Sequence, residues 1–242
     1  MADDTIARRK FLLGAGLAGT AAAAGLTPGM PAEAQPASAA TPAAPPQLVD
    51  EPPVYLTLTA AEAAFVSAAA DTMIPADTLS PSGTECGVVI FADRQLASAW
   101  GGGAKLYRSG PFRKGKPEQG YQLPLTPREY FGIGIAATNA WTRKTHGKDF
   151  DRLDVKQREE SLKALESGKA ELGDFSGKEF FDALLTLVME GFFADPIYGG
   201  NKDKAAWRMI GFPGLPALYA NLVDEYRTKR YVAEPQSIAD FS

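Results

Sequence analysis

Helix-start signals recur along the chain and constrain its fold more than any other feature of the sequence. Each is a Ser, Thr or Asp followed three residues later by Glu or Gln, so that the two side chains can satisfy each other's free backbone donors. The pairs are Thr59 with Glu62, Thr126 with Glu129, Asp154 with Gln157 and Ser176 with Glu179. Apolar residues at helical spacing follow each pair, and alternating runs of strand length are nearly absent. The sequence therefore predicts a single all-α domain.

Five to seven helices joined by long loops account for the apolar pattern. The expected segments, with their boundary signals, are 59–75, 85–100, 126–147, 154–168, 176–192, 203–210 and 215–227. The segment over 176–192 is the most apolar, so we expect it to lie at the centre of the domain. Residues 101–125 contain many Gly, Pro and Lys residues, which predicts a long surface excursion.

The N-terminal residues carry the features of an export signal. Arg8 and Arg9, followed by Phe11 and Leu12, precede a Gly- and Ala-rich apolar stretch, an arrangement typical of the twin-arginine route for folded cargo. Cleavage is expected before Gln35, after Ala32-Glu33-Ala34, with Ala37-Ser38-Ala39 as a second candidate site. An uncleaved transmembrane anchor is the alternative, but the stretch is shorter and less apolar than a spanning helix requires. These features predict a signal over 1–34, a flexible Ala/Pro-rich linker over 35–53 and a helical domain over 54–242.

Charge and residue content exclude several classes of function. The formal net charge of −4 gives no indication of nucleic-acid binding or of an anionic membrane surface as partner. Cys86 is the single cysteine and His146 the single histidine, which excludes thioether haem attachment and a zinc or iron–sulfur site built from this chain alone. Neither a nucleophile elbow nor a phosphate loop is present. We therefore expect no catalytic residue, cofactor site or metal site in this chain.

Cys86 has two interpretations. At the start of an expected helix it can serve as a small buried apolar residue. In an oxidising compartment it can instead form a disulfide with another chain. The sequence leaves both open.

One segment, from residue 189 to 214, differs from ordinary helix sequence. Glycines, prolines and an Asp-Pro turn alternate there with aromatic residues. Aromatic side chains on a restricted backbone are typical of interface hot spots, whereas the alternative is a pair of tight interhelical turns with core aromatics. Under the partner-interface hypothesis the contact residues are Glu190, Phe192, Phe193, Asp195, Pro196, Tyr198, Gly199, Gly200, Asn201, Trp207, Phe212 and Pro213.

The same segment carries a resemblance to a known family. It reads EGFFADPIYGGN over 190–201, then Trp207 and GFPG over 211–214, and this pattern resembles the signature of the gluconate 2-dehydrogenase subunit 3 family. Further similar runs are ADTMIPAD over 70–77, CGVV over 86–89, DRQL over 93–96 and YRSGP over 107–111. The resemblance extends from about Thr57 to Tyr219.

What the resemblance implies is the small subunit of a three-part periplasmic dehydrogenase associated with the inner membrane. The large subunit of such complexes is a flavoprotein of the glucose-methanol-choline (GMC) type, which binds FAD and oxidises a sugar or sugar acid. A multihaem cytochrome c subunit anchors the complex and passes electrons to quinone, and an iron–sulfur cluster is a further candidate cofactor of the partners. The small subunit holds no cofactor, binds the flavoprotein, and supports its maturation and its export through the twin-arginine translocase.

The sequence indicates the class of dehydrogenase complex more clearly than it indicates the substrate of that complex. The insertion over 113–125 is closer to gluconate-oxidising members than to the shorter glucose or fructose relatives, so a gluconate 2-dehydrogenase (acceptor) complex is expected. The alternatives are the small subunit of a sorbitol, fructose, glucose or 2-ketogluconate dehydrogenase. In another class, the chain is a free-standing periplasmic ligand-binding or structural helical protein that uses the turn around Asp195.

Overall fold

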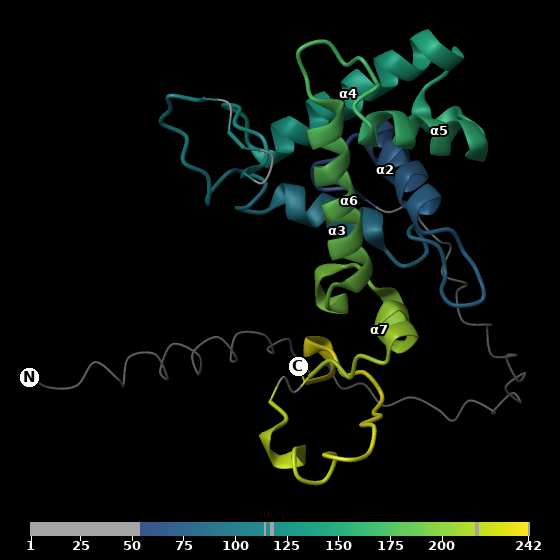
Figure 1. The fold of residues 1–242 in the computed structure, drawn as a ribbon, viewed down its shortest axis with the longest axis vertical. Coiled ribbons are helices and arrows are strands. Elements are labelled where there is room, and N and C mark those ends of the chain that lie inside the picture. Colours follow the sequence, from purple (N-terminus) through teal and green to yellow (C-terminus); the bar gives the residue numbers. More distant parts are fainter. Residues whose placement is uncertain (1–53, 114, 117–118, 216–217, 242) are drawn as a thin grey trace, which may run out of the picture. The chain divides into compact units, whose positions relative to one another are not determined.

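The computed structural model describes residues 54–113, 115–116, 119–215 and 218–241. The predicted signal over 1–34, with Arg8, Arg9, Phe11 and Leu12, and the predicted linker over 35–53 lie outside this part of the chain. The described residues form six α-helices and no strand, which confirms the predicted all-α fold with long loops (Figure 1). The helices are α2 Ala60–Met73, α3 Val88–Ala97, α4 Pro127–His146, α5 Val155–Glu166, α6 Gly177–Phe193 and α7 Ala205–Ile210. None of them combines the length and apolarity needed to cross a bilayer.

Short 3₁₀ turns complete the connections. They are η3 Phe150–Arg152, η4 Pro196–Tyr198, η5 Lys202–Lys204, η6 Ala220–Leu222 and η7 Ile238–Phe241. Residues 101–125 contain no α-helix where they are described, which agrees with the predicted surface excursion.

Side-chain caps begin the helices where the sequence predicts them. Reciprocal capping boxes form at Thr59, Thr126 and Asp154. The fourth pair forms only half of its box, because Ser176 Oγ accepts from the backbone N of Glu179 at 3.2 Å while the Glu179 side chain lines a surface cavity. These caps satisfy donors that a helix start would otherwise leave free, so local signals determine where four of the six helices begin.

The helix α6 lies at the centre of the core, as its apolar sequence predicts. It contacts α3, α4, α5 and α7, and Figure 1 shows it among these elements. Phe180, Leu184 and Val188 are almost fully buried along it. On α4, Gly134 permits the close approach of Phe180, since a Cβ there would lie 2.2 Å from the ring. One face of α6 remains open, because Leu185 and Met189 are 37% and 40% exposed.

The predicted helix over 215–227 is wrong for the described residues of that segment. Only the short turn η6 forms there, and Leu218 is 79% exposed. Tyr231 instead packs edge-on against Tyr219 and Tyr226, with ring centroids 5.8 Å and 4.9 Å apart. An isolated helix of this length depends on an apolar face packed against a core. Here the aromatic side chains pack against one another, so helical periodicity has no core to support it.

Two other helices begin later than predicted because of the backbone conformation before them. The helix expected from residue 85 starts at Val88, since Gly87 has a φ of +82°. The helix expected from residue 203 starts at Ala205, since Asp203 and Lys204 have φ values of +56° and +58°. Left-handed residues cannot belong to a right-handed helix.

A buried carboxylate attaches the start of the domain to α3. Asp93 is 2% exposed and accepts three backbone N–H bonds: from Leu56 at 2.7 Å, and from Thr57 and Leu58 at 2.9 Å each. These bonds hold the segment immediately before the capping box of α2. Asp93 therefore couples residues 56–58 at the start of the domain to its core.

Candidate partner interface

The turn that follows α6 is built around the side chain of Asn201. This side chain is fully buried. Its Nδ2 donates to the carbonyl of Ala194 and its Oδ1 accepts from the backbone N of Ala206, both at 2.9 Å. Asn201 has a φ of +46°, a conformation that asparagine tolerates better than most residues. One amide thus joins the end of α6 to the start of α7.

Gly200 in this turn and Gly87 before α3 allow the turn to pack directly against backbone. A Cβ on Gly200 would lie 2.0 Å from the carbonyl oxygen of Gly191, and one on Gly87 would lie 2.4 Å from that of Gly199. The backbone N of Lys202 donates to the carbonyl of Cys86 at 3.0 Å. The signature turn is therefore docked on the start of α3 through main-chain contacts that leave no room for side chains.

Trp207 closes the turn from the side of α7. It is 6% exposed, and its indole Nε1 donates to the carbonyl of Phe193 at 2.8 Å. The ring of Phe212 packs edge-on against it with centroids 5.2 Å apart. A Cβ on Gly214 would lie 2.8 Å from the Trp207 ring, so the end of the segment lies close over the indole.

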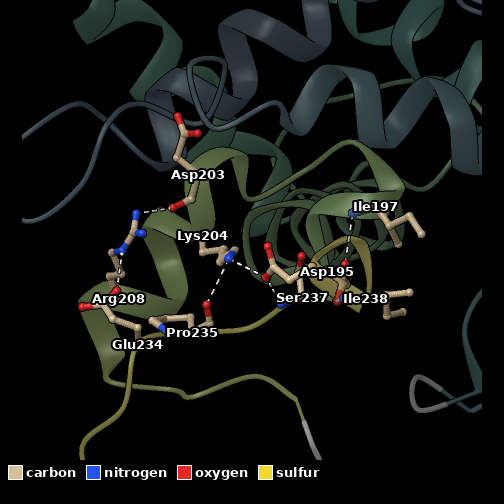
Figure 2. A network of polar contacts seen from close by, with 10 residues as sticks. Asp195, Ile197, Asp203, Lys204, Arg208, Glu234, Pro235, Ser237 and Ile238 are labelled. Atoms are coloured by element: carbon tan, nitrogen blue, oxygen red, sulfur yellow. Dashed lines mark hydrogen bonds and ion pairs between the residues drawn. The ribbon is translucent and has the colours of Figure 1, made fainter. Parts of the chain in front are cut away.

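Asp195 connects the signature turn to the C-terminal tail (Figure 2). One carboxylate oxygen caps η4 by accepting from the backbone N of Ile197 at 3.0 Å, and the other accepts from the backbone N of Ile238 at 2.9 Å. A single side chain therefore bridges positions 43 residues apart in the sequence.

A second set of polar contacts holds the same tail. Lys204 Nζ donates to Asp240 Oδ2 at 2.6 Å and to the carbonyl of Pro235 at 3.0 Å. Figure 2 shows the second of these contacts. The hydrogen bonds from Lys204 and from the backbone N of Ser237 lower the pKa of the Asp240 carboxyl. Arg208 adds an ion pair to Glu234 at 3.4 Å. The tail is thus held against the signature turn.

The structure divides the predicted contact residues by exposure. The buried ones are Phe192, Gly200, Asn201 and Trp207. Those partly exposed are Phe193, Asp195, Pro196, Gly199 and Pro213, and those exposed are Glu190, Tyr198 and Phe212. The buried members build the turn, as the structural interpretation of the segment predicts. The exposed members leave side chains available to a partner.

Sequence reasoning missed four apolar residues that the same segment exposes. Their exposed fractions are 40% at Met189, 44% at Ile197, 37% at Met209 and 54% at Ile210. Ile197 follows the Asp-Pro pair in the same short turn as Tyr198, which is 50% exposed. Apolar letters alone do not separate these residues from core residues, because exposure depends on which face of each short helix packs inward.

Cys86 is buried in the described part of the chain. Its side chain is 1% exposed, and Sγ lies 3.7 Å from the carbonyl of Pro81. Burial, with the nearby charges of Glu85 and Asp203, raises the pKa of the thiol, which disfavours the reactive thiolate. A disulfide to another chain stays a prediction, and it would require the turn around Cys86 to open.

Comparison with known families agrees with the signature. The model of the family described as gluconate 2-dehydrogenase subunit 3 matches residues 60–214, from the start of α2 to the glycine packed beside Trp207. No curated protein and no solved structure matches the chain. Among the described residues, no group of three or more His, Cys, Asp or Glu side chains is arranged to hold a metal ion. The family match covers well over half of the sequence and confirms the resemblance: the chain belongs to the gluconate 2-dehydrogenase subunit 3 family.

Proposed function

We propose that this chain is the non-catalytic small subunit of a periplasmic flavoprotein dehydrogenase of the gluconate 2-dehydrogenase type. In this role it binds the GMC-type FAD subunit, stabilises it and escorts it in folded form through the twin-arginine translocase. A multihaem cytochrome c subunit holds the assembled complex at the inner membrane. Family membership supports an accessory role in a dehydrogenase complex.

The observation that carries the proposal is the construction of the signature turn. Its backbone is fixed by the Asn201 amide and by close glycine contacts, while Ile197, Tyr198 and Phe212 remain 44%, 50% and 43% exposed. Apolar side chains held in place before binding lose little conformational freedom when a partner covers them. Such a turn is suited to contact with a protein surface.

The N-terminal sequence supports the escort part of the proposal. Arg8 and Arg9 are typical of a route that carries folded cargo. A flavoprotein that acquires FAD in the cytoplasm must cross the membrane folded. A signal on the subunit that binds it would serve the whole complex.

Export of the partner tests the escort role. Arg8→Lys with Arg9→Lys should leave both this chain and the FAD subunit in the cytoplasm, measured as flavin-linked dehydrogenase activity in periplasmic and cytoplasmic fractions. Active FAD subunit in the periplasm of this variant would refute escort by this chain.

Replacement of exposed residues on the turn tests the interface. Ile197→Ser and Tyr198→Ser should each weaken the affinity of the tagged chain for the FAD subunit by about thirtyfold, the scale at which an interface hot spot begins, and recovery of the FAD subunit with the tagged chain should fall accordingly. Val155→Ser on α5 is the matched control, since Val155 is 65% exposed and lies outside the family signature. Equal recovery with all three variants would contradict this placement of the interface. Oxidation of a sugar acid by the purified chain alone would instead favour a free-standing enzyme.

A further inference from the structure

A surface cavity of about 340 Å³ lies along one face of α6 and reaches Glu190, the first residue of the signature segment. The face contributes side chains at intervals of three or four residues, as one side of a helix does. The opposite wall comes from the first turns of α4 and from the excursion that precedes it. The lining residues include Glu179, Asp182 and Glu190 from α6, Phe131 from α4, Tyr121 from the excursion, and Trp100 directly before the excursion. We refer to this space as the acidic groove.

The middle of the acidic groove is apolar. Phe131 and Leu187 form its floor and are only 4% and 2% exposed, whereas Trp100 and Leu106 at its edge are 38% and 43% exposed. Tyr121 stacks on Tyr130 with ring centroids 3.9 Å apart. An occupant must therefore present an apolar portion to aromatic walls.

The two ends of the acidic groove carry carboxylates. Glu179 and Asp182 lie near the N-terminus of α6, and Glu190 lies in its last turn. At a rise of 1.5 Å per residue, Glu179 and Glu190 are about 16 Å apart along the helix axis. A single cationic group cannot contact carboxylates at both ends of the groove. An occupant that neutralises both ends must therefore be extended and must carry two cationic groups.

The described residues supply little positive charge to neutralise these carboxylates. Asp182 pairs with Lys178 at 3.4 Å, but no ion pair to Glu179 or Glu190 forms within the described part of the chain. Partial burial raises the pKa of the Glu190 carboxyl. Its position at the C-terminus of α6 adds an unfavourable interaction with the helix dipole. Glu190 is therefore the carboxylate that an external cation would stabilise most.

A buried hydroxyl belongs to Tyr130, which stacks on Tyr121 but does not itself line the acidic groove. The Oη atom of Tyr130 is enclosed and has no hydrogen-bond partner in the described structure. Burial, followed by the charges of Glu179, Tyr121 and Asp182, raises the pKa of this phenol. All three of these neighbours line the groove. The phenol therefore stays protonated behind the wall and adds no charge to the carboxylates of the groove.

We infer that the acidic groove receives an extended segment of the flavoprotein partner in which two basic side chains flank an apolar one. Arginine suits both ends, because its guanidinium binds carboxylates through two parallel hydrogen bonds and stacks on aromatic faces. The apolar side chain between them covers Phe131 and Leu187. This inference rests on the proposed function, and it adds a second contact that Glu190 places next to the signature turn.

Neutral isosteres of the two end carboxylates test the inference on the assembled complex. Glu190→Gln should raise the dissociation rate of the FAD subunit from immobilised full-length chain by at least about tenfold, because the occupant buries this charge pair and loss of a buried pair acts on dissociation. Glu179→Gln should act similarly, and the double variant should combine the two effects because the sites are well separated. Glu159→Gln on α5 is the control, since that exposed carboxylate pairs with Lys163 at 3.5 Å and should leave the rate unchanged.

A photo-crosslinking residue in place of Thr186, between the two ends of the groove, identifies the occupant. The cross-linked partner peptide should contain two Arg or Lys residues, and their reversal to Glu should restore binding to a chain carrying Glu179→Lys and Glu190→Lys. A cross-linked peptide without basic residues, or a cross-link to lipid, would overturn the inference. An unchanged dissociation rate in the Gln variants would also overturn the inference but would leave the proposed function intact. If the unaltered chain retains no flavoprotein, the inference and the proposed function are both refuted. Unchanged thermal unfolding of each variant separates these outcomes from misfolding.

Discussion

Asp93→Asn should destabilise the domain far more than neutralisation of a comparable aspartate at the surface. The substitution preserves the size of a side chain that is 2% exposed. An NH₂ group then replaces one of the two carboxylate oxygens. The oxygen lost is either the one that accepts from the backbone N of Leu56 or the one that accepts from those of Thr57 and Leu58. Any remaining bonds lose the assistance of the negative charge. The change therefore removes at least one bond and leaves a backbone donor facing an amide donor.

The magnitude follows from the number of bonds and their burial. A hydrogen bond to a charged group contributes about 1.5–3 kcal/mol, and a buried donor left without an acceptor costs about 1–3 kcal/mol. We therefore expect Asp93→Asn to lower the free energy of unfolding by about 2–4 kcal/mol. For a domain of this size, each 1 kcal/mol shifts the thermal midpoint by about 2–4 °C, which gives a decrease of about 4–16 °C.

Asp71→Asn provides the matched control. Asp71 also accepts a backbone N–H, from Thr84 at 2.8 Å, but it makes a single bond near the surface. Both substitutions remove one negative charge, so effects of net charge cancel in the comparison. Thermal unfolding followed by circular dichroism should place Asp71→Asn within about 4 °C of the unaltered chain, consistent with a cost of about 1 kcal/mol. Thermal midpoints of the two variants that differ by less than about 2 °C would refute the argument from buried hydrogen bonds.

Three further predictions concern the signature turn and its tail. Asn201→Asp should cost about 2–4 kcal/mol in chemical denaturation, because it loses the donor to a buried carbonyl; Asn139→Asp should cost less, since the structure uses Asn139 Oδ1 only as an acceptor. Gly200→Ala should lower the thermal midpoint, because its Cβ would lie 2.0 Å from a carbonyl oxygen. In the control Gly102→Ala, the new Cβ meets no atom closer than 3.5 Å. Equal thermal midpoints for the two variants would contradict the close packing at Gly200. Since the folded pKa of Asp240 is lowered, its contribution to stability is present above the unfolded value of about 3.9 and is lost as pH falls through the folded value. The stability difference between Asp240→Asn and the unaltered chain should therefore vanish in acid, and a difference independent of pH would exclude this assignment.

Sequence reasoning located the helices whose start signals are local. Thr59 and Thr126 form the predicted capping boxes because their partners lie three residues away, within reach of side chains on the same turn. The apolar residues of α6 predicted its central position, since a helix that is apolar on most sides is stable only when buried. Its open face was not predicted, because carboxylates and apolar residues alternate there at helical spacing.

The candidate site was predicted only in outline. The letters from 190 to 214 identified the family and the segment, yet they did not separate Asn201, which is fully buried, from Tyr198, which is 50% exposed. The acidic groove was not predicted because one wall comes from α6 and the other from α4 and the excursion before it, and these two walls are far apart in the sequence. No pattern within one segment reports that such surfaces meet.

The sequence by itself determined the helical class and the starts of the capped helices, because these depend on neighbours within one or two turns of chain, and its motifs indicated the family. Tertiary structure alone decided that residues 215–227 fail to form an α-helix where they are described, that Asp93 holds the first turn of the domain across 35 to 37 residues, and which aromatic side chains of the signature remain exposed. The physical reason is the same in each case. Burial and long-range hydrogen bonds depend on which surfaces pack together, and local propensity does not contain that information.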